Sequence, residues 1–239
     1  QKVLILANKE QRGYITPQEF NSFANQAQME IFEQYFYDIE QWGRKPGNEY
    51  EYSDMVTNIE EKIGKFQVND ASFAGTVSGG LDLSQGDIYK LGTIRVKYSN
   101  QGGGGYNRAE QLTVAEFDLY EKSPLTKGTP KRPYYTLQAR SISQRTLAAK
   151  FSPGLGSGDN ALLSYIRQPL NVSWGYVVVQ GTALFDPSLN KTQNFELHLS
   201  EEVELVYKIL KLAGVTIQNN DIVQMAQAAE TAQIQQEKQ

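Results

Sequence analysis

The 239-residue chain contains no cysteine and only one histidine, His198. Without cysteine it can form no disulfide, no thiolate nucleophile and no cysteine-ligated zinc site. With one histidine it cannot build a metal site from several imidazoles, and a Ser-His-Asp triad would have to use His198. His198 lies between two leucines, and a structural hydrogen bond to Ser200 or to a backbone group is the better interpretation of it. We therefore expect no metal, no cofactor and no catalytic residue.

Long apolar runs are also missing from the sequence. No stretch of about 18 apolar residues occurs, so no membrane span is expected. Apolar residues make up 40% and charged residues 21% of the chain, which is typical of a folded protein. The net charge of -4 argues against a general nucleic-acid-binding protein. The run Gly102–Gly105 lacks the GK[ST] of a phosphate-binding loop, so it predicts a loop tip.

Helical patterns occur at both ends of the chain. Thr16 at an N-cap, Pro17 and Glu19 form a capping-box signature before a long apolar periodicity that ends near residue 42. Near the other end, Ser200 is expected to cap a helix that stops at Gly214. These two helices are distant in sequence, and their apolar faces predict that they pack together.

The middle of the chain has a strand-like texture. From Phe66 onward, short alternating or β-branched stretches are separated by turn residues. They are FQVND, LGTIRVKYS, YYTLQARS, TLAAKFS, ALLSYIRQP, YVVVQGTALF and NFELHL. One short helix is expected after Thr113, which forms a second capping box with Glu116.

Together these patterns predict an α+β protein whose N- and C-terminal helices form a bundle with an inserted β-rich, sandwich- or barrel-like domain. The expected parts are an N-terminal helical part at 1–65 and a β-rich domain at 66–199. C-terminal helices at 200–239 are expected to pack on the N-terminal part and to end in an assembly tail.

An acidic segment runs from Glu49 to Glu61. Clustered carboxylates of this kind could supply the acid and base of a glycan hydrolase, which is one alternative function. Acids crowded in a polar segment are more often a solvated face, and the segment lacks the spacing of a calcium loop.

A basic stretch follows. Between Glu121 and Asp159 there is no acid, but there are seven cations. Within it, KGTPKRPYY combines cations, prolines and tyrosines in what we expect to be an exposed loop, with a solvated loop, a protein contact or a DNA contact all open. The candidate partner-binding residues are Lys127, Lys131, Arg132 and Tyr134, together with Gln227 and Ile234 in the alanine- and glutamine-rich tail.

Three stretches of the chain carry a family resemblance. They are VLILANKEQRGYITPQEFNSFANQAQMEIFEQYF near the start, WGYVVVQGTALFDPSLNKTQNFELHLSEEVELVYKILKLAGV, and the final IQQEKQ. They resemble head-to-tail connector (ring) proteins of crAss-like and related short-tailed phages of Bacteroidetes. The resemblance covers the two ends of the chain and is weak across the middle.

The resemblance implies a virion structural protein that is not an enzyme. Such adaptors form a ring, commonly of twelve copies, beneath the portal, and they link the DNA-filled capsid to the tail. The implied partners are the portal protein, neighbouring copies, and the next tail or ring component. Weak, non-specific contact with DNA in the lumen is also implied, and no membrane. The implied location is the head-to-tail interface of the virion, after synthesis in the host bacterial cytoplasm.

A β-rich glycan- or receptor-binding module remains an alternative function, favoured by the fourteen tyrosines of the chain.

Overall fold

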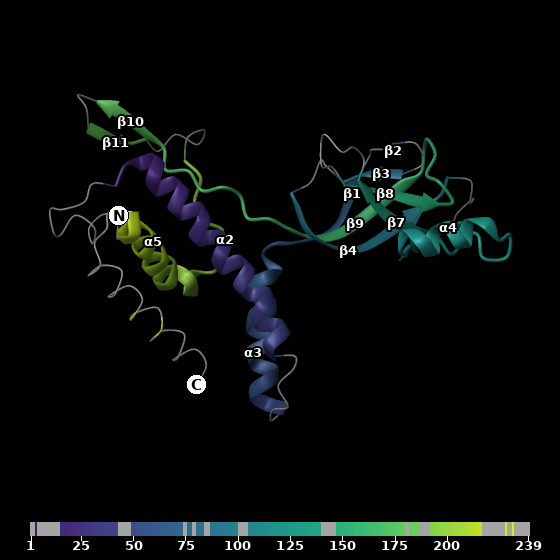
Figure 1. Cartoon of the computed structure of the whole chain (residues 1–239), viewed down its shortest axis with the longest axis horizontal. Helices are drawn as coiled ribbons and strands as arrows, with labels where there is room; N and C mark the ends of the chain where they lie inside the picture. The colour runs from purple at the N-terminus through teal and green to yellow at the C-terminus, as the bar shows by residue number, and fades with distance from the viewer. Residues whose placement is uncertain are drawn as a thin grey trace. The chain divides into compact units, whose positions relative to one another are not determined.

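The chain folds as a mixed α+β protein in a computed structural model, which confirms the expected class (Figure 1). The structure describes residues 3, 15–42, 49–73, 76–77, 80–83, 87–99, 105–139, 147–179, 182–186, 192–216, 228 and 231. The helices are α2 (Pro17–Trp42), α3 (Glu49–Gly64), α4 (Val114–Lys122), α5 (Glu202–Thr216) and the 3-10 turn η1 (Leu199–Glu201). The strands are β1 (Gln67–Phe73), β2 (Thr76–Val77), β3 (Gly80–Asp82), β4 (Ile88–Lys97), β5 (Asn107–Arg108), β6 (Glu110–Gln111), β7 (Tyr134–Ala139), β8 (Leu147–Ser152), β9 (Asn160–Arg167), β10 (Tyr176–Val179) and β11 (Thr182–Phe185).

These elements belong to two compact units. One, the helical unit, consists of Gln1–Lys65 and Pro169–Gln239, and the other, the β-rich unit, is Phe66–Gln168. The helical unit includes α2, α3 and α5, and α4 belongs to the β-rich unit.

The helical unit is organised around α2. The predicted capping box opens the helix, since the Thr16 N–H donates to Glu19 Oε2 at 2.9 Å and the Glu19 N–H to Thr16 Oγ1 at 3.3 Å. The helix contacts both α3 and α5, and α5 lies beside it in Figure 1. Its buried face is apolar and consists of Ala24, Ala27, Ile31, Phe32 and Tyr35. Full burial of a side chain such as Phe32 contributes about 1.5–3 kcal/mol, so this face holds α2 in place.

A second face of α2 is polar and binds an extended segment, residues 170–174. Asn25 Nδ2 donates to Val172 O at 3.0 Å, and the Val172 N–H donates to Asn25 Oδ1 at 2.6 Å. One helical turn earlier, Asn21 makes the same pair of bonds with Trp174, at 3.5 and 2.7 Å. Beyond Asn25, Gln28 Nε2 donates to Leu170 O at 2.8 Å. We call this row of bonds the amide ladder. The same segment leads into the two-stranded hairpin of β10 and β11.

The β-rich unit contains two sheets that share one core. The strand orders are β1-β9-β4-β5 and β2-β3-β8-β7-β6. The core draws buried side chains from both sheets, among them Leu81, Ile94, Val96, Phe151 and Leu163. Ala109 carries the chain from one sheet to the other: its N–H donates to Ile94 O at 2.9 Å, and the next N–H, of Glu110, donates to Pro133 O at 3.0 Å.

Three local predictions are wrong. NFELHL forms no strand; instead Glu196 accepts a hydrogen bond from the Leu170 N–H at 2.8 Å. Ser200 is not the cap near the C-terminal helix, because the His198 side chain accepts from the Ser200 N–H at 3.3 Å and caps η1, and α5 follows η1. The bond between His198 and Ser200 was expected, but its capping role was not. Gly214 does not end the helix, since α5 continues to Thr216 and Gly214 is buried within it.

Candidate functional site

The first part of the basic stretch forms a tightly braced loop, residues 123–133, which we call the α4–β7 loop. It starts where α4 ends: the Ser123 N–H donates to Tyr120 O at 3.4 Å. Pro124 follows at a position where its fixed φ suits a turn. The turn is closed by the N–H groups of Thr126 and Lys127, which both donate to Ser123 O, at 3.2 and 3.0 Å. Thr126 Oγ1 also donates to Tyr120 O at 3.1 Å, which ties the turn back to the helix.

The second half of the loop is held against the sheets. Thr129 and Arg132 exchange backbone hydrogen bonds of 3.3 and 2.9 Å. Asn107 Nδ2 donates to Pro130 O at 2.9 Å. Gly128 lies so close to β8 that a Cβ at this position would overlap the carbonyl group of Ser152. Only glycine fits this contact without movement of the loop.

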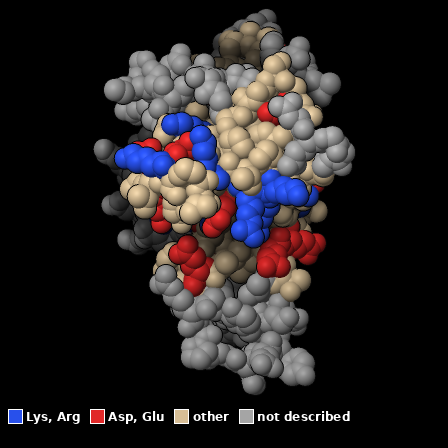
Figure 2. Space-filling model, turned by 90° about the vertical axis from the view of Figure 1, so that its right-hand side faces the viewer, with Lys and Arg blue, Asp and Glu red and all other residues tan. Residues whose placement is uncertain are grey.

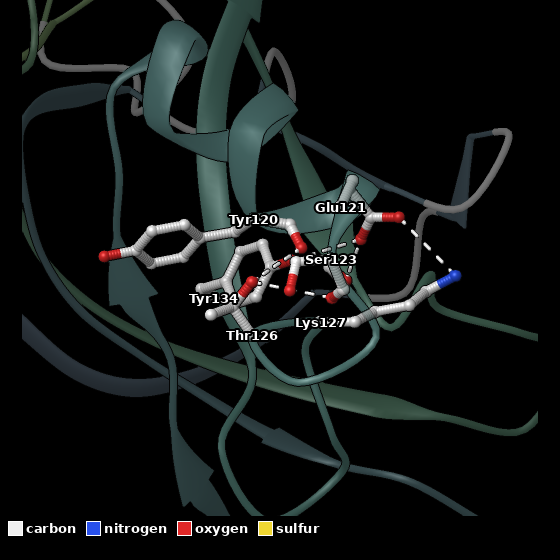
Figure 3. Close-up of polar contacts among 7 residues, drawn as sticks. Tyr120, Glu121, Ser123, Thr126, Lys127 and Tyr134 are labelled. Carbon is white, nitrogen blue, oxygen red and sulfur yellow. Dashed lines mark hydrogen bonds and ion pairs between the residues drawn. The ribbon is translucent and has the colours of Figure 1, made fainter.

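Glu121, at the end of α4, is the polar hub of this region (Figure 3). Its Oε1 accepts from Ser152 Oγ and from Tyr134 Oη, the latter at 3.3 Å, and its Oε2 lies 3.6 Å from Lys127 Nζ. The hydrogen bond from Ser152, followed by the nearby charge of Lys127, lowers the pKa of the Glu121 carboxyl against the opposing effect of burial. Glu121 therefore stays ionised near neutral pH and joins the helix, the loop and two strands.

The structure exposes some of the candidate partner-binding residues and buries another. Lys127 has 57% of its side chain exposed, and Lys131 and Arg132 are also exposed on the α4–β7 loop. Tyr134 is only 5% exposed. Its ring packs edge-on against Phe117, with centroids 5.3 Å apart. Tyr134 thus supports the loop from beneath and cannot present its ring to a partner. Gln227 and Ile234 lie outside the residues that the structure describes.

Sequence reasoning missed Leu125, the most exposed large hydrophobic residue in the described part of the chain. Its side chain is 97% exposed, although the backbone around it is held by the bonds of the turn. A single leucine between Pro124 and Thr126 gives no signal in a sequence, because isolated apolar residues are common on protein surfaces. Its significance comes only from the combination of exposure and a fixed backbone.

The charges around this region are mixed. Figure 2 shows Lys and Arg side chains beside Asp and Glu side chains on this face, not one continuous positive surface. Lys127 is itself paired with Glu121. Of the three cations on the α4–β7 loop, Lys127 is in an ion pair and Lys131 and Arg132 are in none, so these two are available to a partner.

The remaining candidate sites are weaker. The acidic segment lies on α3, where the described carboxylates Glu60 and Glu61 are exposed, as a solvated face predicts. Within the described ranges, no three Asp, Glu or His side chains cluster as metal ligands. A shallow polar cleft of about 460 Å³ lies near Arg108, Glu110 and Tyr135. Burial raises the pKa of Tyr135, so its hydroxyl is not a base at neutral pH.

The chain matches no protein-family model and no curated protein. Of the helices in the described part of the chain, none has the length and apolar character needed to cross a membrane.

Proposed function

We propose that the chain is a virion structural protein, a head-to-tail adaptor subunit that forms a ring beneath the portal and links the DNA-filled capsid to the tail. The observation that carries the proposal is the α4–β7 loop, which holds an exposed leucine and exposed cations on a backbone fixed by several hydrogen bonds. Such a feature serves contact with another macromolecule, because a rigid exposed anchor loses little conformational entropy on binding.

The resemblance at the two ends of the chain supports the same proposal. In it, the terminal helices form a bundle that carries the β-rich part as an insertion. The contact of α2 with α5 and the amide ladder agree with this arrangement, since both join residues from the two ends of the chain. The proposed partners are the portal protein, neighbouring copies of the chain, and the next tail or ring component.

The polar groups of the described residues favour a structural role over catalysis. The buried carboxylate of Glu201 pairs with Lys62, and the partly exposed carboxylate of Glu121 binds Ser152, Tyr134 and Lys127. Side chains that satisfy one another in this way stabilise a fold, whereas a catalytic carboxylate pair faces a shared cleft. The adaptor is accordingly proposed to be no enzyme, made in the bacterial cytoplasm and carried in the virion.

Electron microscopy of intact particles tests this proposal directly. The expected result is density for the α+β subunit in a ring between portal and tail, with copies of the chain detected in the same particles by mass spectrometry. A chain that is absent from purified particles would contradict the proposal. Hydrolysis of a polysaccharide by the purified protein, lost in a Glu60→Gln and Glu61→Gln double variant, would favour the hydrolase instead.

A further inference from the structure

Leu125 is exposed at a place where the chain gives it no intramolecular role. Its side chain is 97% exposed, so it contributes almost nothing to the core. Nevertheless the residues on both sides are held: Ser123 accepts two backbone hydrogen bonds, and Thr126 Oγ1 bonds Tyr120 O. The backbone at Leu125 is therefore fixed, and its Cα–Cβ bond points in one direction.

The support beneath Leu125 extends across the β-rich unit. Glu121 connects the end of α4 to Ser152 and Tyr134, Asn107 holds Pro130, and Gly128 lies directly on the backbone of Ser152. An anchor on a preorganised loop binds more tightly than one on a loop that has to be ordered, because the entropy of ordering has already been lost.

The charge around Leu125 indicates which kind of partner surface the α4–β7 loop binds. From Lys122 to Arg132 the chain carries four cations and no acid, and Lys131 and Arg132 are exposed. The acid that directly precedes this run, Glu121, has its carboxylate engaged by Ser152, Tyr134 and Lys127. A partner surface that carries carboxylates would be attracted to this loop, and one that carries cations would be repelled.

We propose that Leu125 inserts into an apolar socket on a partner protein whose surface around the socket is acidic. Lys131 and Arg132 pair with the carboxylates at the rim, and the leucine is the buried anchor at the centre, as in interfaces with an apolar core and a polar rim. The inference rests on the proposed function, in which this partner is the next tail or ring component.

A protein partner explains the loop better than DNA does. Phosphate contacts are made by cations and backbone N–H groups, and they need no apolar anchor. Four cations beside an engaged carboxylate also supply little of the counterion release on which non-specific DNA binding depends. The exposed leucine is the feature that distinguishes the two partners, and it is the residue to change.

The test produces full-length variants in bacteria infected by a phage that lacks the wild-type copy of the gene. Leu125→Ser removes the anchor, and Leu119→Ser is the matched control, because Leu119 is another exposed leucine, 65% exposed, on the neighbouring helix α4. Two quantities are measured: the amount of the chain in purified particles, by mass spectrometry, and the fraction of particles with tails, by electron microscopy.

The expected result for Leu125→Ser is normal incorporation with at least a tenfold lower fraction of tailed particles, since about 1.4 kcal/mol corresponds to a tenfold change in affinity. Leu119→Ser should stay within about twofold of wild type. Normal tails on Leu125→Ser particles would overturn the inference and leave the adaptor role intact. Absence of even the wild-type chain from particles would overturn both.

Three further results would show that Leu125 has a different role. A lower melting temperature of the purified Leu125→Ser protein would show that the leucine stabilises its own fold. A photoreactive residue at position 125 that crosslinks to a second copy of the chain would make this a contact between neighbours. Weaker binding of a short DNA duplex by Leu125→Ser would indicate a DNA contact. The proposal requires instead a crosslink to an acidic peptide of a different virion protein.

Discussion

Asn25 and Val172 bind each other twice, through bonds of 3.0 Å and 2.6 Å that join a helix side chain to the backbone of an extended segment 147 residues away. The amide of Asn25 acts as a neighbouring strand would, offering one donor and one acceptor. Asn21 repeats the pattern two residues further along the segment, at Trp174. The spacings match, because four helical residues rise about 6 Å and two extended residues span about 6.6 Å.

We predict that Asn25→Ala lowers the free energy of unfolding by about 1–3 kcal/mol. The substitution leaves the N–H and C=O groups of the buried Val172 without their partner. Urea unfolding followed by circular dichroism measures the loss. Gln26→Ala is the control, because Gln26 is exposed one residue further along α2 and should change stability by at most about 0.5 kcal/mol. Equal losses from both substitutions would contradict the role of the ladder.

Gly128→Ala should destabilise the protein by about 1–3 kcal/mol. The new methyl group would overlap the carbonyl group of Ser152, and relief of the overlap would disturb the bonds of the α4–β7 loop or the pairing of β8 with β7. The matched variant is Gly105→Ala, whose Cβ would enter open space, so it should be neutral or stabilising by up to about 1 kcal/mol. Thermal unfolding of the two variants beside wild type measures both effects. A neutral Gly128→Ala would show that the loop is not held against β8.

The third prediction concerns acid stability and Glu121. The hydrogen bond from Ser152, with the charge of Lys127, holds the pKa of Glu121 below its usual value of 4.5. A carboxylate whose pKa is lower in the folded state stabilises the fold above the pKa of the unfolded chain, and this contribution is lost as the pH falls through the folded value.

Glu121→Gln should therefore be less stable than wild type at about pH 7, and the difference should shrink as the pH falls below about 4.5. Unfolding free energies measured across this range give the test. The pKa values of Glu19, Glu116 and Asp159 are also lowered, but they act equally in both proteins. A constant gap between the two proteins at all pH values would show that the ionised form of Glu121 is not what matters.

The buried ion pair of Lys62 and Glu201 provides a fourth test. Glu201 is only 2% exposed, and Lys62 reaches it from α3 while lying 5.7 Å from the centre of the Tyr35 ring. Glu201→Gln should cost roughly 3 kcal/mol, because it leaves the cation partly buried without its partner. The double variant Lys62→Met and Glu201→Gln should recover part of this loss. Exposed Glu60 supplies the control Glu60→Gln, with little effect expected. If the stability lost in the double variant equalled the sum of the losses in the Lys62→Met and Glu201→Gln single variants, the two side chains would not be coupled.

Local features of this fold could be predicted from the sequence. The capping boxes of Thr16 with Glu19 and of Thr113 with Glu116 both form, because each depends on residues three positions apart. Five strands of the β-rich unit, β1, β4, β7, β8 and β9, follow from short β-branched stretches, such as LGTIRVKYS, most of which lies in β4. The short strands β2, β3, β5 and β6 lie in none of the predicted stretches. Three of the four basic-loop candidates, Lys127, Lys131 and Arg132, are exposed as their composition indicates.

Features that depend on distant residues could not be predicted. The amide ladder joins segments far apart in sequence, and Asn21, Asn25 and Gln28 give no pattern that separates them from surface amides. The sequence gives no sign that the ring of Tyr134 is buried, and only its packing against Phe117 of α4 explains why it is covered. Glycine is common at the C-terminal ends of helices, but Gly214 is buried by tertiary packing and the helix continues past it.

The amide ladder also sets an order of events during synthesis. The apolar face of α2 and its row of amides leave the ribosome early, but the residues that cover them, 170–174 and α5, emerge only after the whole of Phe66–Gln168. The β-rich unit is continuous in sequence and can complete its core first, since domains generally fold as units while the chain grows. A nascent chain that stops before Leu170 would therefore leave the part of α2 that contacts α5 open to chaperones and to other unfinished chains.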